Sequence, residues 1–159
     1  MSTETKVRPL RRSDHDAVFE MMAEPAAVAM AAFTADDPTD RAAFDEHMER
    51  VLANRGADHW AITDGDGTLV GTIATFPSDE GNPEITYWIA QPHWGQGHAS
   101  RALALILGQT RRPVLARVAL DNLRSRRVLE KSGFDVVGSN RDYAAGRHAE
   151  TEELILRLS

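Results

Sequence analysis

The sequence predicts an α+β domain with a three-layer α/β/α architecture, in which helices cover both faces of a central mixed, mostly antiparallel sheet. Polar turns separate three strand-like runs between residues 59 and 90, and the Asp-Gly turn at 64–67 is typical of an antiparallel meander. An alanine- and leucine-rich helical stretch at 99–109 then joins the run 84–90 to another at 113–120, which predicts a parallel β-α-β crossover. The 159 residues fit a single domain spanning 1–159.

The first half of the chain opens with a short strand at 6–10 and a helix that Ser13 or Asp14 can cap and that runs to about residue 23. Residues 26–33 continue as helix or loop between two prolines, and apolar residues at helical spacing predict a clearer helix over 39–54. In the third meander strand, 84–90, side chains alternate between two faces, so Glu84 shares its face with Trp88.

The second half continues with the helix at 99–109, the strand at 113–120 and a helix over 122–134. That helix ends at Gly133, since a residue without a Cβ fits a left-handed cap. The runs DVVGS, from Asp135, and EELILRL, ending at Leu158, predict a closing pair of strands with a polar stretch between them.

Composition excludes several classes of protein. The chain has no cysteine, which rules out disulfides and thiolate metal sites, and its histidines show no metal-ligand spacing, so we expect no metal. No apolar run has the length of a signal peptide or a membrane span, so we expect a cytoplasmic protein with no membrane partner.

The charge is unevenly distributed. Residues 1–98 hold 7 basic and 17 acidic residues, whereas residues 99–131 hold 8 basic and 2 acidic ones. A cationic stretch in a chain of net charge −6 favours an anionic ligand there, although solvated arginines on helix surfaces are the alternative. No aromatic residue lies within 99–131, which argues against nucleic acid as the partner.

A glycine loop, HWGQGHAS, stands where the strand 84–90 gives way to the next helix. Gly95 and Gly97 let the chain turn, and the small Ala99 lets a neighbour approach. The N–H groups of residues 96–100 lie at a helix N-terminus, which favours a phosphate or diphosphate group. A dinucleotide fingerprint fits less well because its third glycine is missing, and a plain strand-to-helix turn is the remaining alternative.

A second constellation is NLRSRRVLEKSGF, from residue 122. Asn122, Ser125 and Leu129 follow one another along a single helical stripe. Asn122 can equally be the helix N-cap, with Ser125 as a surface residue of the first turn.

Together these motifs resemble the GNAT superfamily of acyl-CoA N-acyltransferases. HWGQGHASRAL is similar to the family's acetyl-CoA loop and NLRSRRVLEKSGF to its second motif, and the nearest branch is that of the ribosomal-protein N-terminal acetyltransferases. Two positions depart from the family pattern. Trp94 stands at the usual Arg or Gln of the loop, and Leu129 stands where many members have a tyrosine acid, so a tyrosine mechanism is not available at that position.

The resemblance implies an N-acetyltransferase that moves an acetyl group from acetyl-CoA to a primary amine, either a protein N-terminus or a small molecule. Glu84 is then the expected general base, directly or through water, with Glu150, Glu152 and Glu153 in reserve. Ser125 is the expected partner or acid of the leaving thiolate, and the Ile89 N–H the expected oxyanion donor. The implied cofactor-binding residues are Trp88, Ile89, Ala90, Gly95, Gln96, Gly97, His98, Ala99, Ser100 and Asn122.

The main alternative is a non-catalytic acyl-CoA sensor, which would keep both motifs without the chemistry; the absence of a tyrosine at position 129 is its support. For the enzyme we expect a small-molecule or peptide amine as the acceptor, and a monomer or homodimer as the assembly.

Overall fold

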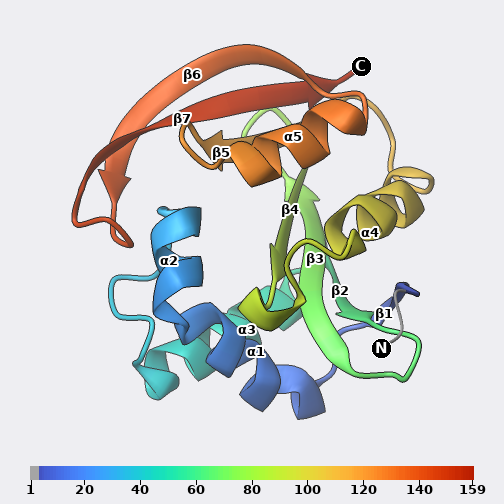
Figure 1. Cartoon of the computed structure of the whole chain (residues 1–159), viewed down its shortest axis with the longest axis vertical. Coiled ribbons are helices and arrows are strands. Elements are labelled where there is room, and N and C mark those ends of the chain that lie inside the picture. Colours follow the sequence, from blue (N-terminus) through green and yellow to red (C-terminus); the bar gives the residue numbers. More distant parts are fainter. Residues whose placement is uncertain (1–3) are drawn as a thin grey trace.

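The computed structural model describes residues 4–159. Within this range seven strands form one sheet, with α-helices and short 3-10 turns between them (Figure 1). The strands are β1 (Lys6–Pro9), β2 (Asp58–Thr63), β3 (Leu69–Pro77), β4 (Pro83–Ile89), β5 (Val114–Ala119), β6 (Asp135–Ala144) and β7 (Ala149–Leu158). The α-helices are α1 (His15–Ala23), α2 (Pro25–Ala31), α3 (Arg41–Ala53), α4 (His98–Leu107) and α5 (Leu123–Lys131), and the 3-10 turns are η1 (Arg12–Asp14) and η2 (Gln91–His93).

The sheet is mixed, as the sequence predicts. Its strand order is β1-β2-β3-β4-β5-β7-β6, and every neighbouring pair is antiparallel except β4 and β5. These two parallel strands pair in register only at Glu84 and Leu115, near their first residues. Beyond that point they diverge, so the sheet opens between the end of β4 and the end of β5.

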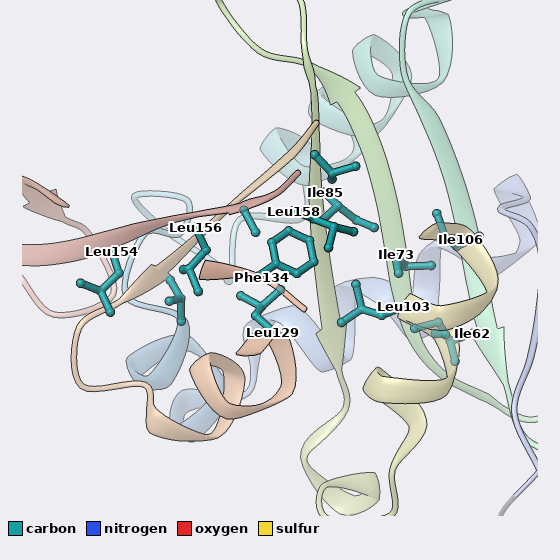
Figure 2. Packing of buried hydrophobic residues seen from close by; sticks show 14 of the residues in the cluster. Ile62, Ile73, Ile85, Leu103, Ile106, Leu129, Phe134, Leu154, Leu156 and Leu158 are labelled. Carbon is teal, nitrogen blue, oxygen red and sulfur yellow. The ribbon is translucent and has the colours of Figure 1, made fainter. Parts of the chain in front are cut away.

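Helices cover both faces of the sheet, which confirms the three-layer prediction. Helices α1 and α2 pack on the face of β3 and β5 opposite to α4 and α5. The main core lies under α4 and α5, where Leu103, Ile106, Leu129 and Phe134 meet the sheet residues Ile73 and Leu156 (Figure 2). Burial of this apolar surface is the main force that fixes both helices against the opened sheet.

Two local expectations needed correction. Asp14 stands at the N-cap position of α1 without capping it, because its carboxylate instead accepts hydrogen bonds from Arg8 and from the Arg11 backbone. The closing hairpin is also longer than the apolar runs suggest, since the polar residues 140–144 and 149–151 belong to β6 and β7. An exposed edge hairpin is held by its backbone ladder and needs no apolar alternation.

Candidate active site

A cleft of about 630 Å³ occupies the opening between β4 and β5. Its walls come from the end of β4, the glycine loop, the first turn of α4, the length of α5 and one side of α2. Nine of the sequence-predicted site residues line it: Trp88, Ile89, Gly95, Gly97, His98, Ala99, Ser100, Asn122 and Ser125. Ala90, Gln96 and Glu84 are not among the lining residues.

The backbone of β4 directs one amide toward this cleft. The Ala90 N–H donates to Val70 O of β3 at 2.8 Å. Because hydrogen-bonding groups alternate along a strand, the Ile89 N–H points the other way, toward the side where β5 diverges. The Ile89 carbonyl lies on that same side and accepts a hydrogen bond from the Trp94 indole at 2.7 Å. Trp94 therefore anchors the loop to β4 at the position where the family more often has Arg or Gln.

Both loop glycines have positive φ, 78° at Gly95 and 81° at Gly97, a conformation that side chains disfavour. Gly97 is the N-cap residue of α4 and provides no side-chain acceptor, so the first-turn amides of the helix lack a side-chain cap. A Cβ on Gly95 would lie 3.9 Å from Arg124 across the cleft, whereas a Cβ on Gly97 would lie 2.5 Å from Arg101. A group in the cleft can therefore come close to the backbone at Gly95, whereas the backbone at Gly97 packs onto Arg101.

Arg101 contacts the backbone of the glycine loop through its guanidinium. Its guanidinium donates to Gln96 O at 2.8 Å and to Thr5 Oγ1 at 2.8 Å, and Thr5 Oγ1 also lies 2.8 Å from His98 Nδ1. The His98 ring is buried, and its Nε2 has no hydrogen-bond partner among the described residues. Burial, reinforced by the charge of Arg101, lowers the pKa of His98.

Part of the cationic stretch does face the cleft. Arg124, Arg127 and Lys131 of α5 line it, and the Arg124 guanidinium lies 5.1 Å from the centre of the Trp94 ring. Arg126 points elsewhere and pairs with Glu130 at 2.8 Å. The positive charges of α5 and the uncapped N-terminus of α4 give the cleft two donor-rich walls suited to an anionic ligand.

Asn122 lies at the start of α5 and is the N-cap that the sequence offered as one interpretation. Its side-chain oxygen accepts a hydrogen bond from the Ser125 N–H and caps the helix, and the residue also lines the cleft. Ser125 Oγ lies 2.6 Å from the hydroxyl of Tyr87. Leu129 is buried in the core and offers no polar group.

Tyr87 is the site residue that motif reasoning missed. Its alternation with Ile85 and Ile89 assigns it to the α4–α5 face of the sheet, but only the fold brings Ser125 against it. Burial raises the pKa of Tyr87 to about 12, and the hydrogen bond with Ser125 offsets part of that rise.

Glu84 lies at the other end of β4, beside β5. Its carboxylate is 3.4 Å from Arg117 Nε, and Arg117 also contacts Glu153 at 3.0 Å. Burial raises the pKa of Glu84, and the charge of Arg117 opposes that rise. Of the glutamates held in reserve, Glu153 is buried in this ion-paired group, and Glu150 is exposed on the hairpin.

A second cavity, of about 590 Å³, lies on the opposite face of β4, between the sheet and helices α1 and α3. Tyr87 and Trp88 line both cavities, so the two meet near the C-terminal end of β4. The lining is largely apolar, with Met22, Phe33, Phe44, Met48 and Val51, and its charged or titratable groups are Asp37, Asp40, His47, Arg50 and His59. Burial, reinforced by the nearby His47, lowers the pKa of His59.

Within residues 4–159, none of the helices combines the length and the apolar character that crossing a membrane requires. The same residues contain no group of three or more His, Asp or Glu side chains arranged to hold a metal ion.

The family model described as "Acetyltransferase (GNAT) domain" matches residues 5–135. A comparison with curated protein sequences gives no significant match.

Several solved structures share the fold at low sequence identity. The spermidine N-acetyltransferase of Vibrio cholerae, in complex with CoA and spermine, is 18% identical with a TM-score of 0.76, over 98% of this chain and 96% of that one. RimJ of Mycobacterium smegmatis, in complex with CoA-disulfide, is 22% identical with a TM-score of 0.80, over 98% and 82%. The ribosomal-protein-alanine N-acetyltransferase of Brucella melitensis is 16% identical with a TM-score of 0.78, over 96% and 98%.

Proposed function

The chain belongs to the GNAT acetyltransferase family, and we propose that it acetylates a singly charged amine with an apolar body, using acetyl-CoA as the donor. The single observation that carries this proposal is the meeting of the two cavities at Tyr87 and Trp88. One cavity has cationic and amide-rich walls suited to the donor, and the other has largely apolar walls suited to an acceptor. The family match is to an acetyltransferase domain, which favours an enzyme over a non-catalytic sensor.

The donor fits the cleft between β4 and β5. The N–H groups of the first turn of α4, with the open space at Gly95, suit a diphosphate, and Arg124, Arg127 and Lys131 suit the additional phosphate of CoA. The pantetheine arm then lies along Trp88 and Ile89, within reach of Asn122. This arrangement brings the thioester to the C-terminal end of β4, where the Ile89 N–H can donate to its carbonyl oxygen as that oxygen becomes negatively charged.

The acceptor fits the second cavity. Its two carboxylates, Asp37 and Asp40, face a single guanidinium, that of Arg50. Asp40 is also engaged in capping α3, and Asp37 in binding Thr39. A polyamine with several charges would need more free carboxylates than this cavity provides. We therefore infer an amine with one ammonium group and apolar neighbours, such as a peptide N-terminus or an arylalkylamine.

Glu84 remains our proposed general base, acting through water. Its side chain shares the face of β4 with Thr86 and Trp88, and both of these line the acceptor cavity. Trp88 lies four residue steps along the strand from Glu84, roughly 13 Å, which is too far for direct contact with an amine bound beside Trp88. A carboxyl with a raised pKa is a better proton acceptor near neutral pH than a fully solvated one. His59, held neutral by its lowered pKa, is the second candidate base.

Within the family we infer a place near the ribosomal-protein N-terminal acetyltransferases. The stretch YWIAQPHWGQGHA and the motif NLRSRRVLEKSGF support this branch. The fold similarity to RimJ and to the ribosomal-protein-alanine enzyme is consistent with it.

An acceptor panel tests the proposal. Acetyl-CoA is mixed with the protein and, in separate reactions, with short peptides bearing different first residues, phenylethylamine, or spermidine, and the release of free thiol is followed. The proposal predicts higher kcat/KM for a peptide or phenylethylamine than for spermidine. A strong preference for spermidine would overturn the assignment of the acceptor, and no turnover with any amine would overturn the proposed activity.

A further inference from the structure

We propose that Tyr87 is a positioning residue that turns the hydroxyl hydrogen of Ser125 into the cofactor cleft, toward the sulfur that leaves. This inference rests on the proposed function, because it assumes that the thioester lies beside Ser125. It replaces the missing tyrosine of α5 with a pair of hydroxyls contributed by two different elements.

The geometry supplies the first argument. The Tyr87 hydroxyl lies 2.6 Å from Ser125 Oγ and 3.3 Å from Ser125 O, so Oγ is its closer partner. A hydroxyl carries a single hydrogen and two acceptor lone pairs. If Tyr87 donates its hydrogen to Ser125 Oγ, the hydrogen of Ser125 is left for a third atom. Because Ser125 lines the cleft, a ligand bound there can provide that atom.

The fold supplies the second argument. Tyr87 packs partly against the main core, and Ser125 lies in the first turn of α5, whose start is fixed by the Asn122 cap. Both hydroxyls are thus attached to backbone of regular secondary structure. A hydrogen-bond donor whose direction is already fixed needs little reorganisation free energy to stabilise a developing charge. Leu129, at the position of the family's usual tyrosine, is buried in the core and contributes no hydroxyl to the cleft.

The pKa of Tyr87 decides whether this residue gives its proton to the leaving sulfur or only orients Ser125. When the amine nitrogen bonds to the thioester carbon and the C–S bond breaks, the sulfur leaves with the electron pair as a thiolate. A thiol has a pKa of about 8.5, whereas burial raises the pKa of Tyr87 to about 12. A proton transfer from Tyr87 would therefore run uphill. The pair instead stabilises the thiolate by a hydrogen bond from Ser125, which Tyr87 orients and polarises. The proton that the amine nitrogen loses passes to the proposed general base and on to solvent, and the released thiolate equilibrates with the protons of the solvent.

The test is a double-mutant cycle on kcat with a verified amine substrate, using Tyr87→Phe, Ser125→Ala and the double variant. A lost hydrogen bond to a charged group corresponds to roughly a tenfold to hundredfold loss of rate. We expect such a loss in kcat for each single variant, little change in KM for acetyl-CoA, and no further loss in the double variant. Tyr143→Phe is the matched control, because Tyr143 is the other tyrosine of the chain and is exposed on β6.

A second readout separates orientation from folding. With the selenium analogue of acetyl-CoA, whose leaving group needs less stabilisation, the deficits of both single variants should shrink together. Melting temperatures identify any variant that has lost its fold. Multiplicative losses in the double variant, a deficit confined to KM, or a Tyr87→Phe deficit that persists with the selenoester would each overturn the proposal. If the unmodified protein shows no activity with any amine, that result would instead refute the proposed function.

Discussion

Replacing Gly95 by alanine tests whether the glycine loop binds the donor through close backbone approach. Gly95 has a φ of 78°, and a Cβ there would face the cleft with Arg124 as its nearest neighbour, at 3.9 Å. The methyl group therefore meets no obstacle in the free protein. It occupies the space that an anionic group needs in order to reach the N–H groups at the start of α4.

The expected magnitudes differ for folding and for binding. An alanine at positive φ costs about 1 kcal/mol of folding free energy, which lowers Tm by roughly 2–4 °C in a chain of this size. Loss of one charge-assisted hydrogen bond costs about 1.5–3 kcal/mol, so the Kd for acetyl-CoA should rise roughly tenfold or more.

Gly67→Ala is the matched control. Gly67 has a φ of 85° with nothing within 4 Å of an added Cβ, and it lies in the β2–β3 turn, outside the residues that line the cleft. Both variants carry the same backbone strain, so calorimetric titration with acetyl-CoA isolates the effect of the cleft. If Gly95→Ala and Gly67→Ala bind acetyl-CoA equally well, the loop is only a structural turn and the donor site has been assigned wrongly.

Three further outcomes are expected. Glu84→Gln should lower kcat by about a hundredfold if Glu84 is the base, and Glu80→Gln, at an exposed turn carboxylate, is the control. Because burial raises the pKa of Glu84, the parent's kcat should fall on acidification at a higher pH than an ordinary carboxyl would cause. A Glu84→Gln variant that keeps the parent's kcat from pH 6 to 9 would move the search to His59. Arg8→Met should cost about 2 kcal/mol of unfolding free energy, measured in urea at pH 7, because it leaves the buried Asp14 carboxylate without its guanidinium. The Arg8 hydrogen bonds lower the pKa of Asp14, so this stabilisation is present above the unfolded pKa near 3.9 and disappears as pH falls through the folded value. An equal loss at pH 2 would contradict the ion-pair explanation. Stability should also decline as pH falls below about 6.5, since burial lowers the pKa of His98 and the unfolded chain binds the proton first; His98→Leu should reduce that slope by up to one proton, and an identical slope would show that the ring does not titrate with unfolding.

Patterns in the sequence predicted the features that depend on local order. The Asp-Gly turn and the helical stretch between two apolar runs were enough for the mixed sheet and its parallel crossover. The glycines before α4 and the Asn122-to-Ser125 spacing predicted residues that line two walls of the cleft, because these residues lie at helix starts that can be predicted from the sequence.

The parts that the sequence did not reveal depend on contacts between distant residues. Tyr87 and Ser125 are 38 positions apart and meet only when α5 packs beside β4. The contact of Arg117 with Glu84 likewise needs the register of β4 against β5. Ala90 lies outside the cleft lining because its N–H belongs to the β3 ladder, and alternation along a strand assigns the exposed amide to Ile89 instead.

In the proposed reaction, a donor bound between β4 and β5 is attacked by an amine from the other face of β4. Incubating the protein with acetyl-CoA and a peptide bearing a free N-terminus, and following thiol release together with the mass of the peptide, measures this reaction. We expect one acetyl group on the peptide amine for each thiol released, and loss of both signals with a peptide whose N-terminus is blocked. Thiol release that continues at the same rate without a free amine, with no acetylated peptide formed, would contradict the proposed reaction.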